Sequence, residues 1–140
     1  MQQNIKKSLE NNLKLFKFPF LPGIVWAIII LVLMTMSGNS FPKFDLINIL
    51  SLDKFVHAFV FFILQLLLCY GFYKQKNKLK RFPILISSII TFTYGIGTEI
   101  VQAVFSLNRK GDYLDVIANS IGIIIAILLC KFLLKKLETS

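Results

Sequence analysis

The sequence predicts an all-α, multi-pass membrane protein with four transmembrane helices packed as a bundle. Hydrophobic residues make up 56% of the 140 residues, and the mean hydropathy is +0.71. A soluble domain of this size cannot bury so much apolar surface, whereas a membrane protein can expose it to lipid. Four runs with almost no charge each reach the roughly 20 residues that a spanning helix needs. No alternation with a period of two indicates a β-barrel.

Charged residues at the ends of the apolar runs mark the expected helices. In chain order, these cover residues 19–36, 54–73, 82–105 and 113–134. Pro19 and Pro22 suit the start of the first helix, where the N–H that proline lacks would have no partner. A cleaved signal peptide is the competing interpretation of this run. Its apolar stretch is too long and no small-residue cleavage site follows it, so we expect a helix.

Basic residues are concentrated on one side of the predicted bundle. Twelve of the 16 lie before the first helix, between the second and third, or near the end of the chain. Short loops rich in Lys and Arg stay in the cytoplasm. We therefore expect cytoplasmic N- and C-termini, with tails over 1–18 and 135–140 flanking a membrane domain over 19–134. The basic loops fit this topology and attraction to anionic lipid, and nothing among them indicates nucleic-acid binding.

Polar side chains from three helices are predicted to meet near the outer face of the membrane. Each helix has a pair at helical spacing: Asp53 and His57, Glu99 and Gln102, Asp115 and Asn119. A polar stripe in lipid must face other helices or a wet cavity. Together with neighbouring charged residues, these pairs predict a ligand-binding site made of Asp53, Lys54, His57, Glu99, Gln102, Arg109, Asp112, Asp115 and Asn119.

Glu99 is the most informative of these residues. If its helix ends near Phe105, Glu99 lies six residues, or about 9 Å, below the outer end. An unpaired acid at that depth costs on the order of 1–3 kcal/mol, so a compensating group is expected. We prefer Arg109, because its fork of donors suits a carboxylate. Lys54, protonated His57 or neutralisation of the glutamate itself are the alternatives.

A purely structural clamp is the other interpretation of the polar stripes. Interhelical hydrogen bonds in membranes contribute about 0.6 kcal/mol on average, and Gln65, in mid-membrane, is expected to make them. Gly95 and Gly97 are expected to allow close helix contact. A clamp does not need so many ionisable groups on one side of the membrane, which favours a polar or charged ligand.

The ordered set of motifs resembles the VanZ-like family of small bacterial membrane proteins. The matching positions are Asp53-Lys54-x-x-His57, Glu99-x-x-Gln102, Arg109 with Asp112, and Asp115-x-x-x-Asn119-x-x-Gly122. The resemblance covers about 52–129 and implies a multi-pass protein of the bacterial cytoplasmic membrane. Its named member is associated with teicoplanin resistance. The chain departs from the family pattern at Leu107-Asn108 and Lys110-Gly111-Asp112, which bears on the ligand preference of this loop.

Two classes of function follow from these observations. In the first, the outer site binds an amphiphilic envelope ligand, namely a lipid head group, a cell-wall precursor or a lipoglycopeptide antibiotic. Membrane lipids are then the expected partners, and an acyl tail would lie between helices. In the second, the protein is a hydrolase of a lipid-linked substrate, with Asp53 orienting His57 as the base and Glu99 as the acid. Ser51 and Ser106 lack triad spacing, so water would be the nucleophile.

A metal site is a third interpretation of the same residues. His57 with Asp53, Glu99 and Asp115 could supply mixed nitrogen and oxygen ligands. The chain has one histidine and no HExxH motif, so we expect no metal and no cofactor. Transport is the least supported function, because the four helices contain no inverted repeat.

Overall fold

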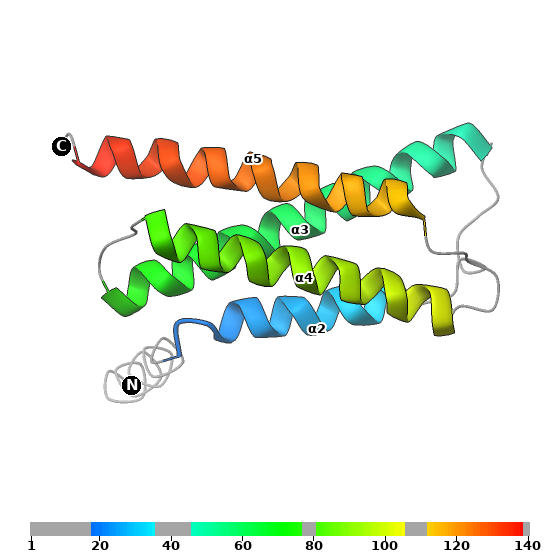
Figure 1. The fold of residues 1–140 in the computed structure, drawn as a ribbon, viewed down its shortest axis with the longest axis horizontal. Coiled ribbons are helices and arrows are strands. Elements are labelled where there is room, and N and C mark those ends of the chain that lie inside the picture. The colour runs from blue at the N-terminus through cyan, green and yellow to red at the C-terminus, as the bar shows by residue number, and fades with distance from the viewer. Residues whose placement is uncertain (1–17, 36–45, 77–80, 106–111, 139–140) are drawn as a thin grey trace, which may run out of the picture.

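A computed structural model of the chain describes residues 18–35, 46–76, 81–105 and 112–138. These residues form four α-helices and no strand: α2 (Leu21–Thr35), α3 (Leu46–Lys76), α4 (Arg81–Phe105) and α5 (Tyr113–Glu138). Successive helices run in opposite directions, so that α3 ends and α4 begins at the same end of the bundle (Figure 1). The predicted all-α class is confirmed.

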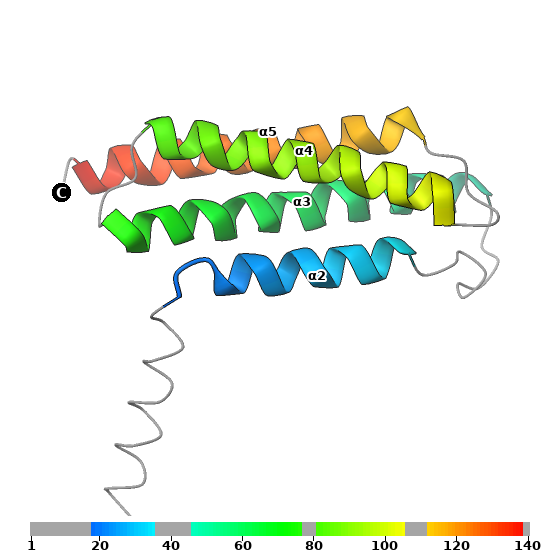
Figure 2. The same cartoon turned by 60° about the horizontal axis from the view of Figure 1, so that its bottom comes forward.

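The centre of the bundle is formed by α3 and α4, each of which contacts the other three helices. Within the described part of the chain, α2 and α5 do not contact each other. In Figure 1 α3 and α4 lie between α5 and α2, and in Figure 2 α3 lies between α2 and the overlapping α4 and α5. Side chains of α3 and α4 can therefore meet residues from every other helix.

Three of the helices are long and apolar enough to cross a membrane. The segments are Leu52–Gln75, Arg81–Phe105 and Tyr113–Leu133. The fourth helix, α2, is apolar but has 15 residues, fewer than a typical span. The chain thus has the helices of a multi-pass membrane protein.

The side chains of α4 are arranged with the polar ones inside. One face buries small and polar residues at helical spacing: Ser87, Thr91, Gly95, Thr98 and Gln102. The other faces expose large apolar side chains, including Ile89 and Ile100. This is the reverse of a soluble helix, and it is typical of a helix that has lipid outside and helix–helix hydrogen bonds inside.

The helix predicted over 54–73 begins earlier than expected, at Leu46. Charged residues marked the start of the apolar span at Lys54, and the observed span, Leu52–Gln75, begins close to it. The helix itself continues outward beyond this span, because charged residues do not end a helix and residues 46–52 contain neither Gly nor Pro. Asp53 and His57 therefore lie within α3, about two and three turns from its start.

Gly122 lets α5 approach α3 closely. A Cβ at this position would overlap the carbonyl oxygen of Ala58 and lie 2.8 Å from its carbonyl carbon. Gly95 also lies at a close contact, because a Cβ there would lie 3.2 Å from the Phe61 ring, which would have to shift by a few tenths of an ångström. The expectation for Gly97 is wrong, since a Cβ at that position would meet nothing within 4 Å.

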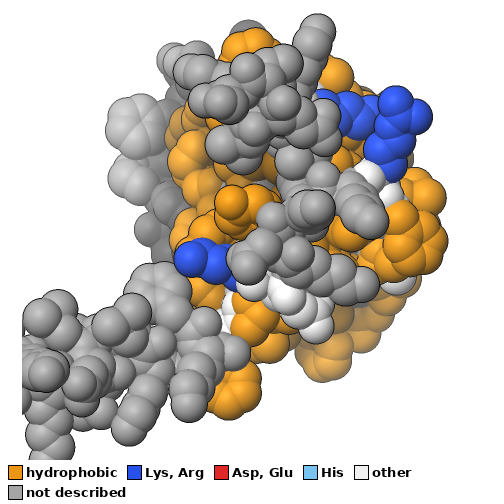
Figure 3. Space-filling view, turned by 90° about the vertical axis from the view of Figure 1, so that its left-hand side faces the viewer, with side chains coloured by type: hydrophobic (Ala, Val, Ile, Leu, Met, Phe, Trp, Pro, Cys, Tyr) orange, Lys and Arg blue, Asp and Glu red, His pale blue; other side chains and the backbone are white. Residues whose placement is uncertain are grey.

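Charges of opposite sign lie at opposite ends of the bundle. Exposed Lys74, Arg81 and Lys131 lie at the end where α3 ends and α4 begins. Viewed from this end, the described side chains are hydrophobic or basic, with no acid visible (Figure 3). The acids with described side chains lie towards the other end: Asp53, Glu99, Asp112 and Asp115.

Candidate functional site

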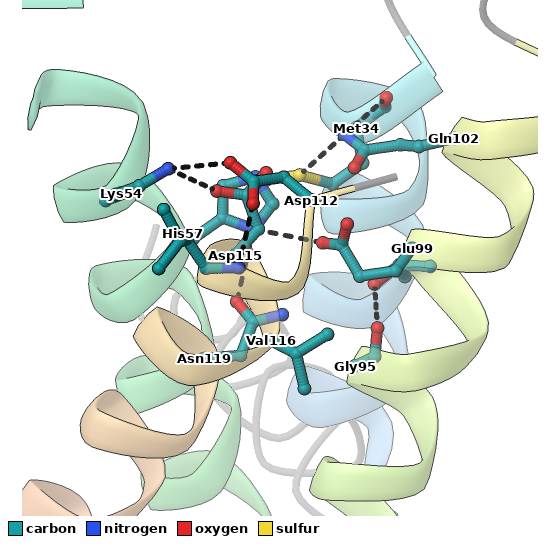
Figure 4. A network of polar contacts seen from close by, with 12 residues as sticks. Met34, Lys54, His57, Gly95, Glu99, Gln102, Asp112, Asp115, Val116 and Asn119 are labelled. Atoms are coloured by element: carbon teal, nitrogen blue, oxygen red, sulfur yellow. Dashed lines mark hydrogen bonds and ion pairs between the residues drawn. The ribbon is translucent and has the colours of Figure 1, made fainter. Parts of the chain in front are cut away.

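Polar residues from α3, α4 and the start of α5 lie together near the acidic end of the bundle, and Figure 4 shows those around His57. We call them the end cluster: Asp53, Lys54, His57, Glu99, Asp112, Asp115 and Asn119. Four of them are buried, namely His57, Glu99, Asp115 and Asn119. The structure thus brings together most of the side chains that the sequence predicted as one site.

His57 lies at the centre of the end cluster and is fully buried, with 0% of its surface exposed. Its Nδ1 lies 3.2 Å from Asn119 Oδ1 and 3.5 Å from Glu99 Oε1. Its Nε2 lies 3.8 Å from Asp115 Oδ2. One imidazole therefore links side chains from α4 and α5.

Lys54 bridges two acids of α5. Its Nζ lies 3.1 Å from Asp112 Oδ2 and 3.3 Å from Asp115 Oδ1. The ammonium thereby contacts one oxygen of Asp115, while the second oxygen faces His57. Lys54 fixes both the position of the first turn of α5 and the orientation of the Asp115 carboxylate.

Asp112 begins α5 as its N-cap residue. The Leu114 N–H donates a hydrogen bond to Asp112 Oδ1 (2.9 Å), and the Asp115 N–H donates to the Asp112 carbonyl (3.0 Å). The Leu114 N–H and the nearby Lys54 ammonium hold the pKa of the Asp112 carboxyl below its ordinary value. Asp115 in the first turn also interacts favourably with the helix dipole.

Gln102 makes its contacts away from the imidazole, with the last turn of α2. Its Nε2 donates to the Met34 carbonyl (3.0 Å) and lies 3.4 Å from Met34 Sδ (Figure 4). Two more hydrogen bonds hold α2 in place, from Trp26 Nε1 to the Val60 carbonyl (2.9 Å) and from the Tyr94 hydroxyl to the Ala27 carbonyl (2.6 Å). The observed role of Gln102 is to join α4 to α2, and its assignment to a ligand site stays a prediction.

Arg109 lies outside the described residues, and so does its predicted pairing with Glu99. Among the described residues, His57 lies beside Glu99, as one of the alternatives expected from the sequence. The loop where the sequence departs from the family pattern, 107–111, also lies outside the described residues.

A second group of buried polar residues lies deeper in the bundle, between α3 and α4. We call it the mid-bundle cluster: Gln65, Cys69, Ser87, Ser88 and Thr91. Gln65 Nε2 donates to Ser87 Oγ (2.9 Å) and Ser88 Oγ (3.2 Å), and Gln65 Oε1 accepts from Thr91 Oγ1 (2.8 Å). The predicted role of Gln65 as an interhelical hydrogen bonder is confirmed.

The two clusters differ in how completely their polar atoms are paired. Among the buried side-chain atoms of the described residues, His57 Nε2 and Asn119 Nδ2 have no hydrogen-bond partner. Both belong to the end cluster, whereas the amide of Gln65 is fully used. Buried polar groups without partners are rare in folded proteins, and they are often explained by an unseen water, ion or ligand.

Sequence reasoning missed two contacts that build this region. The first is the pairing of Lys54 with the cap residue Asp112, for which an Asp just before an apolar helix was an available signal. The second is the Met34 carbonyl that accepts from Gln102. A backbone carbonyl is present in every residue, so the sequence pattern does not indicate which one accepts a hydrogen bond from Gln102.

Comparison with known proteins gives one family match. Residues 2–134 match the sequence model of a family described as VanZ/LLP1. The chain is also 35% identical, over 77 residues, to an uncharacterized protein of the fission yeast Schizosaccharomyces pombe. That alignment covers 55% of this chain and 45% of the yeast protein, so the chain spans less than half the length of its curated relative. No solved structure matches.

Proposed function

The chain belongs to the VanZ/LLP1 family, and from this premise we propose that it binds an amphiphilic envelope ligand through its end cluster. The ligand is a lipid head group, a cell-wall precursor or a lipoglycopeptide antibiotic. The protein would act from the outer face of a bacterial cytoplasmic membrane and contribute to glycopeptide resistance where the ligand is such an antibiotic.

The observation that carries this proposal is the burial of ionisable groups from three chain segments around one imidazole. His57, Glu99 and Asp115 are all buried. The His57 ring lies 3.5 Å from the Glu99 carboxylate on one side and 3.8 Å from the Asp115 carboxylate on the other. Ionisable groups inside a membrane protein are costly and usually mark a ligand or ion site. His57 Nε2 and Asn119 Nδ2 supply polar atoms that the described protein groups leave unused.

The proposed orientation rests on charge. Basic residues flank the end of the bundle opposite the end cluster, including exposed Lys74, Arg81 and Lys131. The positive-inside rule would place that end in the cytoplasm, with both termini, and the end cluster on the outside. All four helices would then cross the membrane, including the shorter α2.

An apolar groove supports a ligand with an acyl tail. The groove lies between α4 and α5, measures about 370 Å³ and is lined by Ser88, Ile89, Phe92, Ser120, Ile123 and Ile124. Ser120 lies more than one turn deeper along α5 than Asp115, so the tail of a ligand with its polar head at the end cluster would run towards this groove. A yeast relative favours a membrane lipid as the ligand, because bacteria and yeast both contain such lipids.

The test is retention of ligand by alanine variants. We expect Glu99→Ala and Arg109→Ala to insert normally and lose co-purifying lipid, measured by native mass spectrometry from membranes and by a teicoplanin resistance assay. Gln65→Leu is the matched control, because it changes a buried polar residue outside the end cluster. Full ligand retention and resistance in both alanine variants would show that the end cluster is not the ligand site.

A second candidate function is hydrolysis of a lipid-linked substrate. It is favoured by the placement of His57 between two carboxylates, at 3.5 Å from Glu99 and 3.8 Å from Asp115. In this geometry His57 is the base that activates water, with Asp53 or Asp115 orienting it and Glu99 as the acid. Turnover of an outer-leaflet lipid extract that disappears in His57→Ala would support this function over binding alone.

A further inference from the structure

Three side chains of the end cluster have the composition and spacing of a metal site. One ligand atom from each of Asp53, His57 and Asp115 lies within 4.8 Å of the other two. In a tetrahedral site with bonds of roughly 2.1 Å, ligand atoms lie about 3.4 Å apart, so side-chain rotations of about 1 Å would close this set around an ion. One nitrogen and two carboxylate ligands suit a first-row divalent ion such as Zn²⁺ or Mn²⁺.

The state of His57 points to a cation and not merely to an acidic patch. Asn119 Oδ1 and Glu99 Oε1 near Nδ1 are acceptors, so Nδ1 carries the proton in the neutral ring. Nε2 then presents a lone pair. It is fully buried, has no hydrogen-bond partner among the described residues and lies 3.8 Å from another acceptor, Asp115 Oδ2. Two acceptors facing each other in a buried site are stabilised by a positive ion between them.

Neighbouring groups orient the proposed ligands in the manner of a second coordination shell. Asn119 holds the His57 ring through Nδ1, and Lys54 holds Asp115 through Oδ1 (3.3 Å). In known metal sites, the second nitrogen of a histidine ligand is usually fixed by an oxygen acceptor in this way. Each contact leaves free the atom that would bind the ion.

We propose that Asp53, His57 and Asp115 bind one divalent transition-metal ion, with Asn119 as a positioning residue. This goes beyond the binding of an amphiphile, and it revises the expectation from the sequence that the chain binds no metal. Three protein ligands leave at least one coordination position open. The ion would therefore be accessible to water or to an anionic group of a ligand.

The test uses the full chain, purified in detergent without a histidine tag and stripped with a chelator. We expect one Zn²⁺ or Co²⁺ per chain by equilibrium dialysis with elemental analysis. Because His57 is the chain's only histidine, ¹⁵N-histidine NMR reports on it alone. Added Zn²⁺ should shift the Nε2 signal towards that of a metal-bound nitrogen. No uptake at micromolar ion, or an imidazolium spectrum that added metal does not change, would overturn the proposal.

Variants separate a metal site from a structural cluster. His57→Gln, Asp53→Asn and Asp115→Asn should each lose stoichiometric binding, and Asp53→Asn is the half-buried position where folding is least at risk. Asn119→Leu should weaken binding roughly 10–100-fold and alter the Co²⁺ absorption spectrum. Gln65→Leu, which changes a buried polar residue of the mid-bundle cluster, is the control and should bind normally. Equal loss in Gln65→Leu would refute the assigned ligand set, and amphiphile retention measured without metal keeps this outcome distinct from failure of the proposed function.

Discussion

The mid-bundle cluster and the end cluster are both buried and polar, yet they differ in chemistry and in pairing. Gln65, Ser87 and Thr91 are neutral and make short hydrogen bonds to one another. The end cluster is built from ionisable groups, its contacts to His57 are 3.2–3.8 Å, and two of its buried nitrogens have no partner among the described residues. The mid-bundle cluster thus completes its own hydrogen bonds, whereas the end cluster leaves two buried nitrogens available to the ligand that we propose.

The largest expected effect is at the contact that holds α5 against α3 beside the end cluster. Gly122→Leu should destabilise the bundle by about 3 kcal/mol, because its side chain would overlap the Ala58 carbonyl. It should also abolish ligand retention, since α5 carries Asp115 and Asn119. Unfolding in mixed micelles measures the stability. Gly97→Ala, where a Cβ meets nothing within 4 Å, should leave both properties unchanged.

The next effect tests whether the end cluster contributes to stability as well as function. Asp115→Asn removes an acid that contacts both Lys54 and His57, and we expect a loss of about 1–2 kcal/mol. The loss is smaller than for a fully buried pair, because Lys54 keeps Asp112 and is 27% exposed. Ligand retention should fall with it. An unfolding free energy equal to that of the wild type would mean that these contacts do not contribute to stability.

Removing the mid-bundle clamp should affect stability alone. Gln65→Leu should cost about 0.6–1.7 kcal/mol, the range for hydrogen bonds in membranes. The cost stays low because the Ser87 and Thr91 hydroxyls keep backbone acceptors, the Ile84 and Ser87 carbonyls. Lipid retention by native mass spectrometry should be unchanged. A loss of retention in this variant would erase the distinction between the two clusters.

The smallest effect is expected at the edge of the end cluster, in Asp112→Asn. Asparagine also caps helices, so the main change is loss of the ion pair with Lys54. The pKa of Asp112 is lowered in the folded state, so its contribution to stability is present above the unfolded pKa of about 3.9 and is lost as the pH falls through the folded value. Acid titration of helicity should therefore show a shallower loss below pH 4 in Asp112→Asn. If the loss of helicity below pH 4 were the same in Asp112→Asn and in the wild type, this role of Asp112 would be contradicted.

The helices and the composition of the end cluster could be predicted from the sequence, because both depend on periodicity. Uncharged runs gave α4 and α5 with their starts correct within a residue, and helical spacing placed His57, Glu99 and Asn119 on inward faces. The start of α3 was predicted too late, since charged residues limit the apolar span, Leu52–Gln75, and not the helix, which begins at Leu46.

The pairing within the cluster could not be predicted, because it depends on how each helix is rotated and displaced relative to the others. Spacing indicates that Glu99 faces inward, but it does not distinguish Arg109, Lys54 and His57 as its neighbours, and the structure describes the contact with His57. Gln102 shows the same limit, because its partner is a backbone carbonyl of an apolar helix. Only coordinates reveal that Asp115 shares its two oxygens between Lys54 and His57.

The absence of a side chain at residue 122 has a consequence for how such a site changes over time. The distance between α3 and α5 is set there by backbone touching backbone, which leaves no rotamer to absorb a larger residue. Any substitution must push the two helices apart as rigid bodies, and Asp115 and Asn119 would move together away from His57. Gly122 thus sets the distance between α3 and α5 for several contacts at once. Substitutions at the surrounding side chains can change which ligand is bound while this distance stays fixed.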